Sequence, residues 1–140
     1  MDKCDVGSIN DVRSIVERFY AQVLDDQIIG YIFTDVVQID LETHLPLIID
    51  FWSDALFGGD RYQGNTLAKH LEVHAKVALK PGHFTRWLYL FNKAVDAEHE
   101  GDNAQRMKQR AEQVAKSISA ALTDQKRSAM TLTLEASKKT

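Results

Sequence analysis

Apolar residues recur at every third or fourth position along most of this chain, which is the spacing of an amphipathic helix. The first periodic stretch follows Ser8 and Asp11, which stand at capping-box spacing, and it ends at Asp25 and Asp26. Its apolar stripe consists of Val12, Ile15, Val16, Phe19, Tyr20, Val23 and Leu24. The pattern predicts an amphipathic helix over this stretch.

A second long helix is predicted after a short apolar turn and a loop over about 34–40. The turn is interrupted only by Gly30 and contains Ile28, Ile29, Ile32 and Phe33, the last of which is expected to point inward. Pro46 lacks an N–H and is tolerated only in a first turn, so we expect the helix to begin near Thr43. Gly58 and the residues after it are expected to close the helix.

Three more helices are predicted downstream. The third is capped by Asn65 or Thr66 and runs to about Leu79, the fourth is broken by Gly101, and Asp102 is expected to cap the fifth. The apolar positions of the fourth helix are Phe84, Trp87, Leu88, Phe91 and Val95, and those of the fifth are Ala104, Met107, Ala111, Val114, Ile118, Ala121 and Leu122.

The last part of the chain, residues 124–140, is polar and basic with little periodicity. We therefore expect a helical domain over 1–123, followed by a frayed helix end and a mobile tail over 124–140. Apolar and polar residues alternate as in a strand only over 130–134, within this tail. The chain is therefore predicted to be all-α.

The composition describes one domain of 140 residues, which is long enough to bury a core without disulfides. Its 17 Lys and Arg against 20 Asp and Glu give a net charge of −3, so nucleic acid and anionic membranes are not expected partners. Cys4 is the single cysteine, which excludes an internal disulfide and fits a reducing compartment. No signal peptide and no apolar run of about 20 residues is evident, so we expect a cytoplasmic protein.

Histidines carry the candidate chemistry. His70 and His74 stand four positions apart and share a helix face, the arrangement that binds zinc in metalloproteases. In that motif glutamate directly follows the first histidine, whereas here Leu71 follows it and Glu72 points about 200° away from His70. Paired Glu-x-x-His motifs, a serine elbow and phosphate-binding glycine loops are absent as well. Most histidines on amphipathic helices are ordinary packing or surface residues, so spacing alone leaves the role of His70 open.

The order of four side chains along the predicted helices narrows the possible roles of His70. Tyr20 lies on the first helix, His44 at the entrance of the next long one, His70 on a capped helix and Trp87 on the helix after it. This order resembles the truncated haemoglobins, and most closely their third group. The matching stretches are Phe19–Val23, Ile29–Phe33, His44–Trp52, Tyr62–Asn65, Ala68–Leu71, His83–Phe91 and Gln109–Ala111.

The resemblance implies a two-over-two sandwich of helices around haem b, with His70 as the proximal ligand of the iron. It implies a distal ligand pocket formed by Tyr20, His44 and Trp87. The other cofactor-binding residues that it implies are Phe33, Ile48 and Trp52 along the apolar wall, and Arg61, Tyr62 and Lys69 near the haem propionates. His74, one turn beyond His70, is expected at the rim of the site, although it is also a rival ligand.

The implied function is the binding of O2, NO or CO at a five-coordinate haem iron, with Tyr20 and Trp87 donating hydrogen bonds to the ligand. Two other function classes stay open. A nitric oxide dioxygenase or peroxidase would use the same residues and would need a separate reductase, because the chain has no flavin or nicotinamide domain. A helical interaction protein without haem would keep the histidines in its core. We expect a monomer or a weak dimer.

Overall fold

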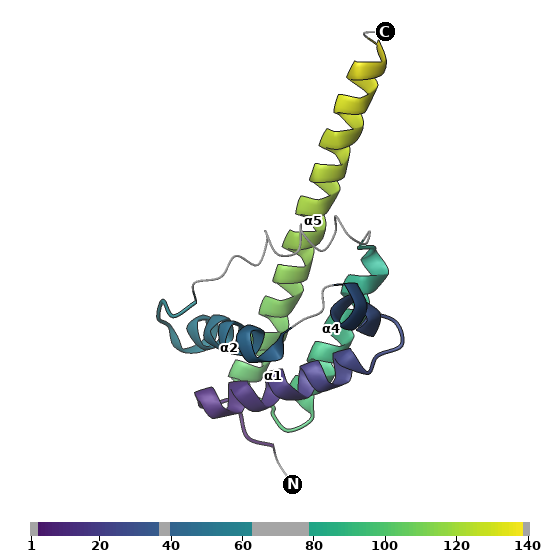
Figure 1. Ribbon diagram of the computed structural model, residues 1–140. Coiled ribbons are helices and arrows are strands. Elements are labelled where there is room, and N and C mark those ends of the chain that lie inside the picture. Colours follow the sequence, from purple (N-terminus) through teal and green to yellow (C-terminus); the bar gives the residue numbers. More distant parts are fainter. Residues whose placement is uncertain (1–2, 37–39, 63–78, 139–140) are drawn as a thin grey trace.

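The computed structural model describes residues 3–36, 40–62 and 79–138 (Figure 1). Within these ranges lie the α-helices α1 (Ile9–Leu24), α2 (Leu41–Phe57), α4 (Pro81–Asp96) and α5 (Asp102–Lys138), with a π-helical turn, η1 (Ile32–Val36), between α1 and α2. The described part contains no strand, and only an isolated bridge joins Cys4 to His99. The predicted all-α class is confirmed, whereas the predicted third helix lies outside the described residues.

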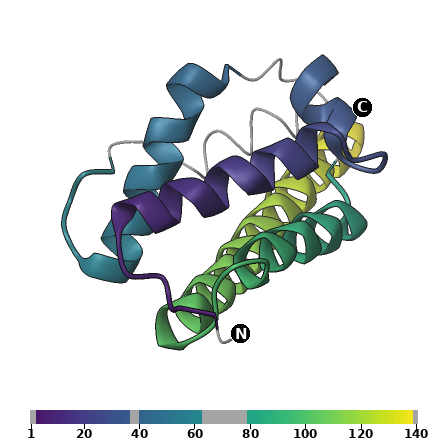
Figure 2. The same cartoon turned by 90° about the horizontal axis from the view of Figure 1, so that it is seen from below.

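The helices form two stacked pairs. One pair is α1 with α2, the other is α4 with α5, and α1 packs across α4 to join them. Figure 2 shows α4 and α5 running side by side, with α1 and α2 lying over them. This is the two-over-two arrangement that the resemblance implies. No helix in the described ranges is both long and apolar enough to cross a membrane.

The core lies between the two pairs and follows the predicted stripes. Every predicted stripe position of α1 is buried except Leu24, which is half-buried. The other helices contribute to the same cluster through Ile49, Trp52 and Leu56 of α2, Leu90, Phe91, Ala94 and Val95 of α4, and Ala104, Met107 and Ala111 of α5. Burial of these apolar side chains is the main stabilising contribution to the bundle.

The start of α2 differs from the prediction. The helix begins at Leu41, because the Asp40 carboxylate accepts hydrogen bonds from the Glu42 N–H at 3.1 Å and from the Thr43 hydroxyl at 3.0 Å. These bonds hold the first turn together, so the helix tolerates Pro46 beyond its first turn despite the missing N–H. The expectation that Thr43 marks the start was therefore wrong by two residues.

The start of α5 is capped from a distant part of the chain. Asp102 was expected to cap this helix, but the carboxylate at its end belongs to Asp5, which accepts from the N–H groups of Asn103 and Ala104, both at 2.9 Å. Burial alone would raise the pKa of Asp5, but these backbone donors outweigh it and lower the pKa. Gly101 has φ +138°, and a β-carbon there would lie 2.6 Å from the Asp5 carboxyl carbon. The cap therefore requires glycine at this position.

The far end of α5 also differs from the prediction. We expected the helix to fray at about residue 124, but it continues to Lys138 and projects beyond the other helices (Figure 1). Residues 124–138 contain no glycine or proline and are rich in strong helix formers, so local propensity favours continuation of the helix. The division of the chain at residue 123 stays a prediction.

Candidate functional site

The centre of the candidate site is a hydrogen bond between Tyr20 and His44. The Tyr20 hydroxyl lies 2.6 Å from His44 Nε2, and the two rings meet edge to face with centroids 5.2 Å apart. Tyr20 is 6% exposed on α1, and His44 is half-buried in the first turns of α2. Burial raises the pKa of Tyr20, so its phenol stays protonated and remains a donor at neutral pH. The bond therefore joins α1 to α2.

Aromatic rings surround the Tyr20 side of this bond. Phe33 of η1 packs edge-on against Tyr20, with ring centroids 6.2 Å apart. Phe19 lies between Tyr20 and Trp87, with centroid distances of 5.1 and 5.7 Å to the two rings. The structure therefore brings Tyr20, His44 and Phe33 into direct contact, and Trp87 joins them through Phe19. No hydrogen bond among the described residues uses the Trp87 indole N–H.

Trp52 is buried in the core, although the resemblance implies that it lines the apolar wall of the cofactor site. It is 4% exposed and stacks on Phe91 at a centroid distance of 4.9 Å, and Phe91 in turn stacks on Trp87 at 5.7 Å. Offset and edge-to-face ring pairs of this kind add stability beyond their buried area. The three rings form a continuous stack from α2 to α4, so Trp52 acts first as a core residue. Its contact with a cofactor stays a prediction.

One face of α2 leads away from His44. Ile48 and Phe51 follow at helical spacing and are both half-buried, and the Phe51 ring meets Tyr62 at 5.3 Å. Tyr62 is fixed further by its backbone N–H, which donates to the Asp54 carboxylate at 2.8 Å. The neighbouring Arg61 is exposed. The polar end of the predicted cofactor site therefore starts where this α2 face ends.

The described residues fit a flat apolar cofactor. Side chains that pack against the core but remain partly exposed are Phe33, Leu41, Leu45, Ile48, Phe51, Leu79, Trp87 and Leu88. They come from η1, α2, α4 and the residue pair before α4, and the Tyr20–His44 bond joins α1 to one of these elements, α2. An apolar macrocycle is the kind of group that would cover such half-buried rings and aliphatic chains. The donor set is equally suitable, because it offers a phenol, an imidazole and an indole and no carboxylate.

Three predicted site residues, Lys69, His70 and His74, lie outside the described residues. The structure therefore describes the residues predicted for the distal side, and both their role and the proximal ligand stay predictions. His83 is described, and its Nδ1 accepts a hydrogen bond from the Lys80 N–H at 2.9 Å at the start of α4. His83 therefore lies in the first turn of α4 and acts as a capping residue of this helix.

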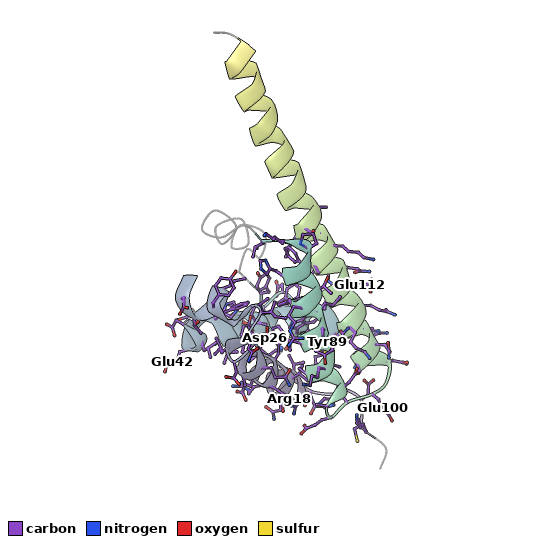
Figure 3. The ribbon with its side chains drawn as sticks, turned by 90° about the vertical axis from the view of Figure 1, so that its right-hand side faces the viewer. Arg18, Asp26, Glu42, Tyr89, Glu100 and Glu112 are labelled. Atoms are coloured by element: carbon purple, nitrogen blue, oxygen red, sulfur yellow. The ribbon has the colours of Figure 1, made fainter. Side chains whose placement is uncertain are left out.

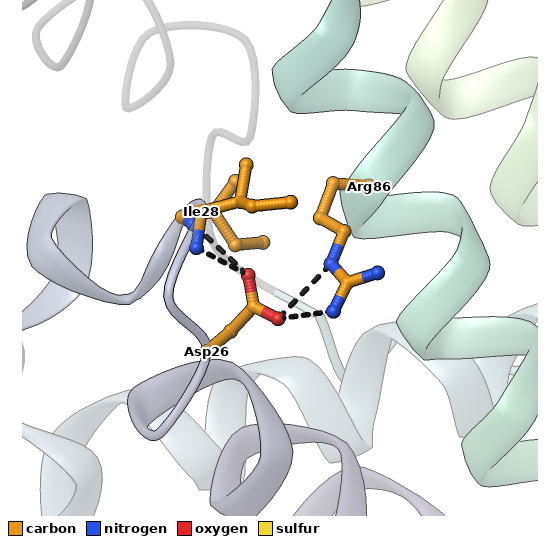
Figure 4. Close-up of polar contacts among 4 residues, drawn as sticks. Asp26, Ile28 and Arg86 are labelled. Atoms are coloured by element: carbon orange, nitrogen blue, oxygen red, sulfur yellow. Dashed lines mark hydrogen bonds and ion pairs between the residues drawn. The ribbon is translucent and has the colours of Figure 1, made fainter.

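Sequence reasoning missed the ion pair between Asp26 and Arg86. One carboxylate oxygen of Asp26 accepts from Arg86 Nε at 3.0 Å and Nη2 at 2.6 Å, and the other accepts from the N–H groups of Ile28 and Ile29, both at 3.0 Å (Figure 4). The Arg86 hydrogen bonds hold the pKa of Asp26 below its usual value, although burial opposes them. An aspartate just after a helix indicates a local turn, but nothing local indicates an arginine 60 residues away.

Two surface grooves lie elsewhere on the molecule. A groove of about 520 Å³ runs between α1 and α4 and is lined by residues that include Arg18, Gln22, Asp26 and Arg86. The Arg86 guanidinium also lies 5.1 Å from the ring centre of Tyr89, which is labelled with Asp26 in Figure 3. A second groove of about 340 Å³ separates α2 from α5. Neither groove is lined by Tyr20 or His44, although Trp52 lines the second one.

Comparison with known proteins agrees with this geometry. Residues 4–120 match the family described as bacterial-like globin. The group 3 truncated hemoglobin ctb of Campylobacter jejuni is 28% identical over 107 residues, which cover 74% of this chain and 82% of that protein. The crystal structure of group III truncated hemoglobin from Campylobacter jejuni superimposes with a TM-score of 0.75 at 25% identity, covering 86% of this chain and 95% of that chain.

Proposed function

We propose, from the premise that this chain belongs to the bacterial-like globin family, that it binds haem b and uses it to hold a diatomic ligand such as O2, NO or CO. The single observation that supports the distal assignment is the 2.6 Å bond between the Tyr20 hydroxyl and His44 Nε2. It places two polar hydrogen-bonding groups among half-buried apolar side chains. Such a donor pair in an otherwise apolar pocket stabilises a small polar ligand more strongly than water would.

The proximal side of the proposal depends on His70. A neutral imidazole is the usual single protein ligand of a globin iron, and His70 would supply it. When bound, haem would supply the iron that coordinates a diatomic ligand. Phe33, Ile48 and Trp52 are proposed to pack against the macrocycle, while Arg61, Tyr62 and Lys69 are proposed to hold its propionates.

On the distal side, the Tyr20 hydroxyl has two possible hydrogen-bond acceptors, which are His44 Nε2 and the ligand. When the His44 ring carries its proton on Nδ1, the Tyr20 hydroxyl donates to Nε2, and binding a ligand requires this hydroxyl to turn away from His44. When the proton is on Nε2, His44 donates to Tyr20 and the phenol proton is directed to the ligand instead. In both tautomers the two side chains form one donor unit. We propose that Trp87 supplies a further N–H from the α4 side.

The ring packing around Tyr20 limits how far this donor can move. Phe33 and Phe19 both meet its ring edge to face, so the phenol is held in one orientation while its hydroxyl proton still rotates. A preorganised donor of this kind loses little conformational entropy when a ligand arrives. We infer slow release of ligands that accept hydrogen bonds, such as O2.

The proposal extends to the setting of the protein. Cys4 is exposed and carries no disulfide, which fits a reducing cytoplasm. Any turnover with nitric oxide or peroxide would draw electrons from a separate reductase. We propose no contact with nucleic acid or membrane, in line with the net charge of −3.

The deciding experiment is an optical titration of the purified protein with hemin, followed by spectra of the ferric, ferrous and carbonmonoxy forms. We expect uptake of one haem per chain and a five-coordinate ferrous spectrum that converts fully on addition of CO. Protein that leaves hemin free at micromolar concentration would refute the proposed function.

A further inference from the structure

The Asp26 carboxylate joins two parts of the fold that each carry a residue of the distal site. It follows α1 directly, and its four hydrogen bonds go to the turn after α1 and to Arg86 on α4. The Asp26 side chain is 4% exposed and that of Arg86 is 34% exposed. Figure 4 shows the carboxylate between the Ile28 backbone and the guanidinium. The pair therefore connects the turn to α4 from the solvent side.

The turn that Asp26 organises leads into the Phe33 side of the site. Gly30 lies so close to the end of α1 that a β-carbon there would be 3.0 Å from the Val23 carbonyl oxygen. The Gly30 N–H also donates to the Asp26 carbonyl oxygen at 3.0 Å. The turn is thus pressed against α1, and it sets the start of η1, from which Phe33 reaches the Tyr20 ring.

The other end of the connection is adjacent to the indole of the site. Arg86 immediately precedes Trp87 on α4, and its guanidinium also lies over the Tyr89 ring. A guanidinium that is bound in a fork to one carboxylate oxygen and stacked on a ring has a nearly fixed direction. Any rotation of α4 about its axis would move Arg86 and Trp87 together.

The Arg86 end of the pair is open to water, which weakens the contribution of the ion pair to stability, whereas the direction in which it holds α4 is a specific consequence of its geometry. We propose that Asp26 and Arg86 are positioning residues that fix the rotation of α4 against α1, and thereby the separation of the Trp87 N–H from the Tyr20 hydroxyl. This inference rests on the proposed function, since the two donors matter only if a ligand reaches both of them. Breaking the pair is expected to loosen the Trp87 side of the distal pocket and leave the Tyr20–His44 bond intact.

The chain offers a matched control. Arg18 of α1 forms a 2.9 Å ion pair with Glu98, just beyond the end of α4, so this pair also connects the two helices but far from the turn. Asp26→Asn and Arg86→Gln remove the positioning pair, and Glu98→Gln removes the control pair. Because Arg86 is one-third exposed, Arg86→Gln is expected to fold even if Asp26→Asn disturbs the turn.

The first measurement uses protein without haem. In ¹H–¹⁵N spectra, assigned with Trp87→Phe, we expect the Trp87 indole N–H resonance to shift or broaden in Asp26→Asn and Arg86→Gln and to stay in place in Glu98→Gln. Arg86→Lys keeps the charge but loses the fork, and it is expected to restore the resonance only in part. An unchanged Trp87 resonance in both pair variants would overturn the positioning role, whatever the outcome of the haem titration.

The second measurement uses protein loaded with haem. We expect the O2 dissociation rate to rise about 3- to 10-fold in the pair variants, as for partial loss of one hydrogen bond, with a shifted C–O stretching frequency in the carbonmonoxy form. Glu98→Gln is expected to match the wild type in both. Dissociation rates and stretching frequencies equal to the wild type in haem-loaded Asp26→Asn and Arg86→Gln would contradict the inference. Failure of the wild type to bind haem would instead refute the proposed function.

Discussion

Replacing Tyr20 with phenylalanine removes one oxygen atom from the centre of the proposed site and leaves the ring packing in place. The Phe19 and Phe33 contacts use the ring of Tyr20 and not its hydroxyl, so the apolar surroundings are expected to persist. The lost group is the partner of His44 Nε2 at 2.6 Å. The variant therefore isolates the contribution of one hydrogen-bond donor.

The magnitude follows from burial and from the kind of bond that is lost. Tyr20 is only 6% exposed, so water does not readily replace its hydroxyl. A well-aligned donor to a partly charged acceptor in such surroundings contributes about 1 to 3 kcal/mol. That range corresponds to roughly a 5- to 150-fold change in an equilibrium or a dissociation rate. The free energy of unfolding is expected to fall by less, about 0.5 to 1.5 kcal/mol, because half-buried His44 regains water when its partner leaves.

The assay is stopped-flow displacement of O2 from the ferrous protein by excess CO. Tyr31→Phe is the matched control, since it makes the same chemical change on a tyrosine that is 43% exposed. We expect Tyr20→Phe to release O2 at least about fivefold faster than the wild type and Tyr31→Phe to release it at the wild-type rate. Equal rates in all three proteins would show that Tyr20 donates no hydrogen bond to the ligand, and the distal assignment would be wrong.

Three further predictions concern the ligand, the helix cap and the chain end. His70→Ala is expected to abolish the five-coordinate ferrous spectrum while His74→Ala keeps it, and the reverse result would make His74 the iron ligand. Asp5→Ala is expected to lower the free energy of unfolding by about 0.5 to 2 kcal/mol and Asp102→Ala by much less. Because the pKa of Asp5 is lowered from 3.8, urea denaturation should show this difference in full above pH 4, and the difference should disappear as the pH falls through the folded value. Deleting residues 124–140 is expected to leave haem uptake unchanged in the hemin titration, and loss of uptake would contradict the division at residue 123.

The sequence predicts those parts of the fold that depend on neighbours along the chain. The stripe of α1 and its cap are local, and the Ser8 hydroxyl accepts from the Asp11 N–H at 3.2 Å as the spacing indicates. The start of α2 was misplaced because a general rule about Pro46 was given more weight than the Asp40 side chain, which has two local partners.

Contacts between distant parts of the chain could not be predicted in the same way. Each of two carboxylates, Asp5 and Asp26, has local partners that the sequence suggests and a second partner far along the chain that it does not. The order of Tyr20, His44 and Trp87 along the helices indicated a shared site, but the residue between the phenol and the indole, Phe19, was assigned only to the core. Spacing along a helix predicts the helix face on which a residue lies, but it does not predict which ring of another helix packs against that residue.

The cap that Asp5 provides for α5 has a consequence for the order of folding. Asp5 is 98 and 99 residues away from the two residues whose N–H groups donate to its carboxylate. The first turn of α5 therefore stays uncapped until the segment before α1 packs against it. Joining segments so distant along the chain is entropically costly and belongs to the slow part of folding. Removal of the first few residues is therefore expected to slow the closing step at α5 and to spare the formation of α1, the helix that they precede.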